Sequence, residues 1–430
     1  MKESVDKTPI AEKSLIQLRA GRRRFYFTIL YLLFMSDFIA RLGITSILPI
    51  IQKDLSLSDT QLGALTSIVL LAMAIFVLLI SFFGERFSTK KAISISACVW
   101  GVGSLFSGIA NSFSVLLTSR FFVGMGNSAY APLSNPMITS MYPTSQWGKK
   151  IGLYNTAMTF GGALGAIFFA KLASENGWRS TFFIIGVISL ILALASLTLP
   201  ETKKVSIANT EEKNHVNLKD AVYNVVKNKA LILTCFGAGI GILALQGISN
   251  WMSIFFVREM GMTVVQAANI IGLTAIIAAL AFPIGGAILD KWYQKDKRSR
   301  VFMPAICFLG CALRFTIGFQ LKLIPVIILG QVVYVLGGTS FHTATQELVP
   351  VWFKSVSYGI YVLFVQFLGA CGPLLAGKMS DVFGLNLSLL MVQLFWLIGI
   401  SILLLASKYY LFSLTIARAQ EQERRTLNGN

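Results

Sequence analysis

Twelve long apolar stretches, separated midway by one polar segment, constrain this chain more than any other feature. A helix that crosses a bilayer needs about 20 mostly apolar residues, and its backbone amides must pair internally because lipid offers no water partners. The sequence therefore predicts an all-α membrane protein with twelve transmembrane helices. We expect these spans at residues 25–50, 58–83, 92–110, 113–137, 150–173, 179–199, 230–257, 264–289, 301–320, 323–349, 356–380 and 387–411.

The basic residues predict the orientation of the spans. Lys and Arg near span ends tend to stay in the cytoplasm, and placing both termini there leaves few basic residues in the outer segments. Those outer residues are Lys53, Lys171, Arg179, Arg258 and Lys322. The net charge of +18 thus reflects topology beside an anionic inner leaflet, and it does not indicate nucleic-acid binding. We expect a multi-pass protein of the cell membrane, of the bacterial inner-membrane type, with a first span that is not cleaved.

The polar segment divides the chain into two halves. We expect a cytoplasmic N-terminal segment (1–24), a six-helix bundle (25–199), a cytoplasmic linker (200–229), a second six-helix bundle (230–411) and a cytoplasmic tail (412–430). The end of the linker repeats apolar residues at helical spacing, which predicts an interfacial amphipathic helix. These residues are Leu218, Ala221, Val222, Val225 and Val226.

The two halves also repeat short patterns. Ser81 to Arg86 ends the second span and Gly286 to Lys291 ends the eighth, each with a small residue, an acid four positions later and then a base. Small residues that allow close helix contact recur in the fifth and eleventh spans, at Gly161, Gly162, Gly165, Gly369 and Gly372. Internal repetition of this kind is typical of two bundles that rock around a central site.

These motifs resemble those of the major facilitator superfamily over nearly the whole chain. Ser81 to Lys91 is similar to its signature between spans 2 and 3, and Gly286 to Lys291 to the copy in the second half. Arg120-x-x-x-Gly124-x-Gly126 is similar to its span 4 pattern, and Asn176 to Phe182 to its entry into span 6. The resemblance implies the major facilitator fold, in which spans 4, 5, 7 and 11 face the centre.

Within that superfamily, the chain most resembles the spinster-like lysolipid and sphingolipid transporters, and next the organic anion:cation symporters. Three segments carry this resemblance: Leu48 to Gly63, Thr345 to Pro350, and Gly372 to Asp381. Both groups usually have Asp-Arg in span 1, where this chain has Ala40-Arg41 with its acid one turn earlier at Asp37. Both usually have Glu in span 4 at the position of Asn127.

Asp37 and Arg41 are the most distinctive charged pair. They lie about 18 and 24 Å into the first span at about 1.5 Å per residue, and their i,i+4 spacing allows pairing. Charges at such depth usually face a bundle interior or an aqueous cavity. We expect a role in proton coupling or substrate binding, with a structural ion pair as the alternative.

Two further arginines lie within spans. Arg314 is about 20 Å into its span and lacks an acid on its own helix, so it could bind an anionic substrate or hold neighbouring helices together. The superfamily resemblance implies a coupling or packing role for Arg120.

Polar and aromatic side chains at mid-depth are candidates for a lined cavity, although each could instead make an interhelical hydrogen bond. They are Asn127, Tyr130, Asn135, Tyr154, Asn155, Gln246, Asn250, Trp251 and Gln366. His342 is a candidate because an imidazole titrates near neutral pH, and a neutral buried histidine is equally compatible.

The repeated acid–base pairs at inner span ends predict a cytoplasmic latch. Glu85-Arg86 and Asp290-Lys291 can stabilise helix termini and contact charges across the halves, and such contacts must break when a cavity opens inward.

The sequence does not predict an enzyme, a cofactor or a metal site. Its glycine-rich stretches lie in apolar spans and lack the Gly-Lys-Ser/Thr ending of a phosphate-binding loop. We expect a secondary active transporter that works by alternating access, with proton symport favoured over antiport. The expected substrate is a small or amphipathic organic anion, including lipid-like anions, and the expected partners are protons and membrane lipids. The alternatives are a drug/proton antiporter and, less favoured, a non-transporting sensor on the same fold.

Overall fold

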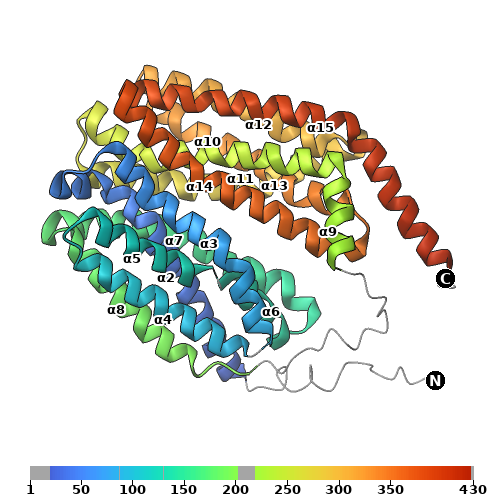
Figure 1. Ribbon diagram of the computed structural model, residues 1–430, viewed down its shortest axis with the longest axis horizontal. Helices are drawn as coiled ribbons and strands as arrows, with labels where there is room; N and C mark the ends of the chain where they lie inside the picture. The colour runs from blue at the N-terminus through green and yellow to red at the C-terminus, as the bar shows by residue number, and fades with distance from the viewer. Residues whose placement is uncertain (1–19, 87, 129, 202–217, 428–430) are drawn as a thin grey trace. The chain divides into compact units, whose positions relative to one another are not determined.

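The computed structural model describes residues 20–86, 88–128, 130–201 and 218–427, and these residues form helices and connecting turns without a strand (Figure 1). Contacts divide the chain into two compact units. The first comprises Met1–Ile50 and Ala72–Lys213, and the second comprises Ile51–Leu71 and Asn214–Asn430. The short segment 51–71 therefore has its main contacts with the second half of the chain.

The first half contains the predicted spans as long helices. They are α2 (Ala20–Leu55), α3 (Asp59–Arg86), α4 (Thr89–Gly108), α5 (Phe113–Asn127), α6 (Tyr130–Met141), α7 (Trp147–Asn176) and α8 (Trp178–Ser196), with a 3₁₀ turn η1 (Thr144–Gln146) before α7. The predicted fourth span, 113–137, corresponds to two consecutive helices, α5 and α6. Every other span predicted in this half lies largely within one helix.

Local sequence signals fix several of these helix ends. The hydroxyls of Ser88 and Ser112 accept hydrogen bonds from the backbone amides of Lys91 and Val115 at the starts of α4 and α5. Gly177 separates α7 from α8 with a φ of 79°, a conformation that favours glycine. The Asn176-Gly177-Trp178 motif is therefore a tight helix connection.

The second half begins with the short helix α9 (Leu218–Lys227) at the end of the linker. The helices that follow are α10 (Lys229–Met260), α11 (Val264–Lys295), α12 (Ser299–Gln320), α13 (Ile324–Glu347), α14 (Lys354–Phe383) and α15 (Leu385–Leu427), with a 3₁₀ turn η3 (Val351–Phe353) before α14. The predicted linker helix is confirmed: Val225 is buried, whereas Val222 and Val226 are exposed. The last predicted span, 387–411, is the first part of α15, which has 43 residues.

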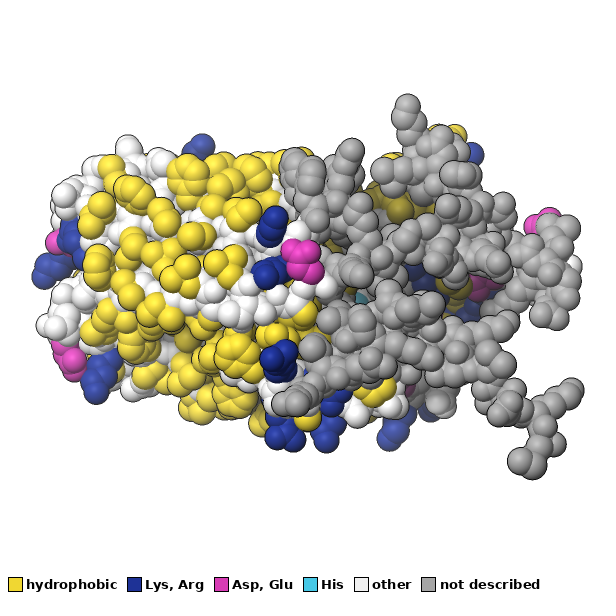
Figure 2. All heavy atoms as spheres, turned by 90° about the horizontal axis from the view of Figure 1, so that it is seen from below, with side chains coloured by type: hydrophobic (Ala, Val, Ile, Leu, Met, Phe, Trp, Pro, Cys, Tyr) yellow, Lys and Arg dark blue, Asp and Glu magenta, His cyan; other side chains and the backbone are white. Residues whose placement is uncertain are grey.

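The helices have the length and hydropathy of membrane spans. Ten helices in the described part of the chain are long and apolar enough to cross a bilayer. Large apolar side chains such as Ile191, Leu194 and Leu280 are at least 60% exposed. Figure 2 shows one face on which hydrophobic side chains form a broad band between groups of charged residues. These observations confirm an all-α membrane protein.

Small residues bring pairs of helices into backbone contact. A Cβ atom on Gly161 or Gly165 of α7 would lie 2.5 Å from the Met35 carbonyl or 2.6 Å from the Ile39 carbonyl of α2. In the second unit, a Cβ on Gly372 of α14 would lie 2.2 Å from the Leu243 carbonyl of α10. Only glycine permits these approaches, so the small residues noted in the sequence set how α2–α7 and α10–α14 pack.

Candidate functional site

Helix α2 places Asp37 and Arg41 on one face, one turn apart. The Arg41 Nη2 atom lies 3.7 Å from the Asp37 Oδ2 atom, and the Asp37 side chain is 3% exposed against 19% for Arg41. The Arg41 guanidinium also lies over the Phe38 ring, 4.0 Å from its centroid, and its Nη1 atom is 3.5 Å from the Met73 sulfur. Asp37 and Arg41 thus form an ion pair with a long N···O distance, and the Arg41 side chain remains partly exposed.

Buried polar atoms without a hydrogen-bond partner among the described residues gather on the helices of the first unit. Asp37 Oδ1 is one of them, and the others include the Ser36 hydroxyl, both amide atoms of Asn127, the Asn135 amide oxygen and the Tyr130 hydroxyl. Asp37 lies within electrostatic range of both Tyr130 and Tyr154. Because a buried polar group without a partner is costly, this concentration makes the cluster the candidate site of the first unit.

Aromatic rings hold these side chains in place. Phe34 stacks on Tyr154 at 4.6 Å between ring centroids and meets Phe38 edge-on at 5.1 Å. Trp100 of α4 contacts Tyr130 of α6 edge-on at 6.0 Å. The structure therefore brings together four predicted site residues, Asp37, Arg41, Tyr130 and Tyr154, from α2, α6 and α7.

Arg120 has a different set of contacts. It is 1% exposed, its Nη2 and Nε atoms donate to the Ser107 hydroxyl at 2.5 and 3.2 Å, and its guanidinium lies 4.5 Å from the centroid of the Phe182 ring. Ser107 in turn hydrogen-bonds Ser119 at 2.7 Å. These contacts join α4, α5 and α8, which favours the packing role over contact with substrate.

The predicted polar residues of the second unit lie on α10 and α14. Asn250 is 8% exposed and its amide donates to the Gln246 carbonyl at 2.8 Å. Gln246 lies beside Gly369 of α14. Gly369 follows Gln366 by three residues on the same helix. Trp251 is buried and donates from its indole nitrogen to the Pro373 carbonyl at 3.1 Å, which ties α10 to α14.

His342 and Arg314 belong to neither of these groups. The His342 ring is exposed and packs against Tyr361 and Tyr358 of α14, at centroid distances of 5.2 and 5.7 Å. Arg314 is half-buried on α12 between the exposed residue Leu313 and the buried residue Phe315. In the described part of the chain, no acidic side chain lies within ion-pair distance of Arg314.

Asp59 is the centre of a polar network that the sequence did not single out. Its carboxylate accepts from Arg258 of α10 at 2.7 and 2.9 Å, from Gln52 at 2.7 Å and from the Ser380 hydroxyl of α14 at 2.5 Å. Asp381 accepts from the backbone amides of Asp59 and Thr60, both at 2.8 Å, and so caps the start of α3. These contacts join the segment 51–71 to α10 and α14 within the second unit.

Glu347 is the centre of a second network in this unit. The Arg300 Nε atom lies 3.0 Å from Glu347 Oε1, Tyr293 donates to Oε2 at 2.8 Å, and Tyr410 donates to Oε1. The predicted latch residues Asp290 and Lys291 are exposed near the end of α11, and the side chains of Glu85 and Arg86 lie outside the described ones. In the turn after α11, a hydrogen bond from Arg298 holds the pKa of Asp296 below its usual value.

Comparison with known proteins gives the family. Residues 30–373 match the model of the major facilitator superfamily. The chain is 26% identical over 375 residues to the hexuronate transporter of Bacillus subtilis, covering 82% of this chain and 86% of that protein. It is 21% identical over 310 residues to the probable sulfoacetate transporter SauU of Cupriavidus necator, covering 68% and 71%.

A solved structure shares the fold. The crystal structure of a bacterial homologue of the human lysosomal transporter Spinster superposes with a TM-score of 0.81 at 21% identity, covering 92% of this chain and 99% of the other. These relatives and fold neighbours are transporters, not enzymes. The expected fold class and the resemblance to spinster-like proteins and organic anion transporters are thus confirmed. The chain belongs to the major facilitator superfamily of membrane transporters.

Proposed function

We propose that this protein is a proton-coupled transporter that moves a small organic anion across the cell membrane by alternating access. The names of its relatives support an anionic substrate, since they are described as transporters of hexuronate and sulfoacetate. Both anions are small: a hexuronate carries one carboxylate, and sulfoacetate carries a carboxylate and a sulfonate. A small organic acid is therefore the substrate class to test first.

The observation that carries the proposal is the Asp37–Arg41 pair beside unpartnered polar atoms. Arg41 is accessible enough to meet an anion, and its planar guanidinium suits a carboxylate or sulfonate. An anion that binds Arg41 draws its positive charge away from the Asp37 carboxylate. A buried carboxylate that loses its positively charged neighbour takes up a proton. Substrate and proton would then bind together, as symport requires.

The Asp59 network supports a gate on the side of the protein where α3 begins. Helices α2 and α3 each run from the first unit into the segment 51–71, whose contacts belong to the second unit. Opening on that side requires Asp59 and Asp381 to lose their partners on α10 and at the start of α3. We assign the opposite latch to Glu85-Arg86 and Asp290-Lys291, at the basic ends of the spans.

The distribution of basic residues supports cytoplasmic termini. In the second unit, Lys291, Lys295 and Arg298 lie at the end of the bundle that also holds α9, whereas Arg258 and Lys322 lie at the other end. By the positive-inside tendency, the end that holds α9 faces the cytoplasm. A bacterial inner membrane is the location that fits the bacterial relatives.

Uptake into proteoliposomes tests this function. Purified protein should accumulate labelled hexuronate or sulfoacetate above equilibrium when the outside is acidic, and a protonophore should abolish the accumulation. Empty liposomes provide the control. Equal accumulation with and without the pH gradient would refute proton coupling. Export of apolar cations without uptake of either anion would instead identify a drug/proton antiporter.

A further inference from the structure

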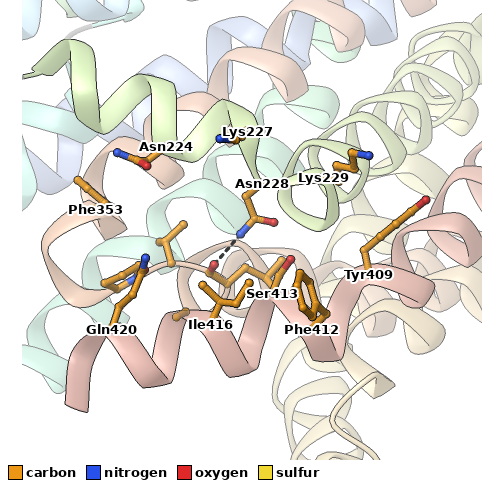
Figure 3. A pocket seen from close by; sticks show the side chains of 14 residues that line it. Asn224, Lys227, Asn228, Lys229, Phe353, Tyr409, Phe412, Ser413, Ile416 and Gln420 are labelled. Carbon is orange, nitrogen blue, oxygen red and sulfur yellow. Dashed lines mark hydrogen bonds between the residues drawn. The ribbon is translucent and has the colours of Figure 1, made fainter. Parts of the chain in front are cut away.

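A pocket in the second unit lies where α9, the start of α10, the turn after α13 and α15 meet (Figure 3). None of its lining residues belongs to the site around Asp37 and Tyr130. Its volume is ≈ 590 Å³, within the range of roughly 300–1,000 Å³ typical of ligand sites. Side chains from α9 and α10 face those of α15 across it. The Asn228 amide donates to the Leu348 carbonyl at 2.8 Å and fixes the start of α10 to the turn after α13.

Two lysines give this pocket a positive rim. Lys227 ends α9 and Lys229 begins α10, and both side chains are exposed. Their Nζ atoms lie 5.6 and 5.7 Å from the ring centroids of Tyr223 and Tyr409. Among the described residues, no carboxylate lies within ion-pair distance of either lysine, so the rim can accept an anionic group.

The other walls of the pocket are apolar and continue onto the outer surface. Leu348, Val349, Phe353 and Ile416 line the pocket, and Phe412 beside them is 69% exposed. On α9, Tyr223 and Val226 are 63% and 52% exposed. Exposed apolar side chains next to lysines are typical of a helix at the interface between headgroups and acyl chains. A free organic anion would use the lysines and leave these apolar surfaces uncovered.

We propose that this pocket binds an anionic phospholipid of the cytoplasmic leaflet. The headgroup phosphate lies between Lys227 and Lys229, and an acyl chain covers Phe412 and Ile416. Because basic residues mark this end of the second unit as cytoplasmic, the lipids nearest the pocket include the anionic ones. The bound lipid holds α9, and with it the end of the linker, against α15.

Lipid binding to the full-length protein tests this site. Short-chain phosphatidylglycerol and phosphatidylcholine with matched acyl chains are titrated in a neutral detergent, and bound lipid is counted by native mass spectrometry. Each basic residue near an anionic lipid is worth about fivefold in affinity, so phosphatidylglycerol should bind roughly 25-fold more tightly than phosphatidylcholine. The double variant Lys227→Gln/Lys229→Gln should lose this preference.

The controls separate the lysines of the pocket from general charge. Lys295→Gln/Lys297→Gln removes two lysines at the same end of the unit and should keep the preference. Phe412→Ser should weaken both lipids by a similar factor. Equal binding of the two lipids, equal loss in the control, or complete competition by glycerol phosphate would overturn the proposal, the last by identifying a site for free anions.

Discussion

Arg258 donates to both carboxylate oxygens of Asp59, with Nη1 2.9 Å from Oδ2 and Nη2 2.7 Å from Oδ1. This two-pronged contact joins the end of α10 to the start of α3, and the Asp59 side chain is only 8% exposed. Bidentate pairs between arginine and a carboxylate are among the strongest hydrogen-bonded contacts in proteins. In the proposed alternating-access cycle, opening on this side would break this pair.

Arg258→Gln should favour the state in which the gate is open. The variant leaves a mostly buried carboxylate with Gln52 and Ser380 alone, and the loss of a charged hydrogen-bonded partner costs about 1–3 kcal/mol. Spectroscopic labels at the exposed positions Lys53 and Val382 measure the separation, which should lengthen.

Arg298→Gln is the matched control for this variant. It breaks the exposed pair with Asp296, which is worth about 0–1 kcal/mol, and should leave the distances between the labels unchanged. If the distances between the labels in Arg258→Gln equal those of the wild type, Arg258 does not hold the gate closed.

Gly63→Ala should also prevent closure, but for a steric reason. A Cβ at residue 63 of α3 would lie 2.3 Å from the Pro373 carbonyl oxygen of α14, and a backbone atom cannot move away without shifting the helix. We expect a longer separation between the same labels and slower transport. Gly359→Ala on α14 meets nothing within 4 Å and should transport normally. Wild-type distances in Gly63→Ala would mean that this close contact is not needed for closure.

Asp37→Asn should abolish accumulation driven by the pH gradient while exchange of substrate continues. The amide keeps the size of the side chain but cannot bind and release a proton. Counterflow measures exchange and uptake against the gradient measures coupling, both at equal protein per liposome. Glu175→Gln, which neutralises an exposed carboxylate at the end of α7, should retain both activities. Full accumulation by Asp37→Asn would place proton coupling at another residue.

Arg41→Gln should weaken binding of an anionic substrate by about 10-fold or more, since hydrogen bonds to charged groups contribute about 1.5–3 kcal/mol. Binding of the neutral amide of the same substrate should change much less. Arg120→Gln should instead lower the thermal midpoint and affect both ligands alike, because Arg120 contacts Ser107 and Phe182. Arg314→Gln tests the remaining deep arginine in the same assay. Equal losses for both ligands in Arg41→Gln would indicate a packing role.

Features with local causes could be predicted from the sequence. Hydropathy alone placed the long helices, and the helical repeat paired Asp37 with Arg41, which the structure places 3.7 Å apart. The amphipathic spacing at Leu218 to Val226 likewise predicted α9. The fourth span was predicted as one helix, because its apolar character continues across the change from α5 to α6.

The Asp59 network could not be predicted in this way. Asp59 and Arg258 are 199 residues apart, and the backbone amide of Asp59 and its partner Asp381 are 322 apart. Hydropathy does not specify which ends of distant helices meet. One usable signal was present: Asp59 and Asp381 both lie in the segments that carried the resemblance to spinster-like proteins, and Glu347 lies in a third.

The length of α15 has a mechanical consequence. Its 43 residues span about 65 Å at about 1.5 Å per residue, roughly twice the hydrocarbon thickness of a bilayer. Its last turns continue past the rest of the second unit (Figure 1). Because the helix is continuous, a small tilt of its part within the membrane moves its C-terminal end by a larger distance. A fluorophore at the C-terminal end of α15 would therefore report tilting of this helix.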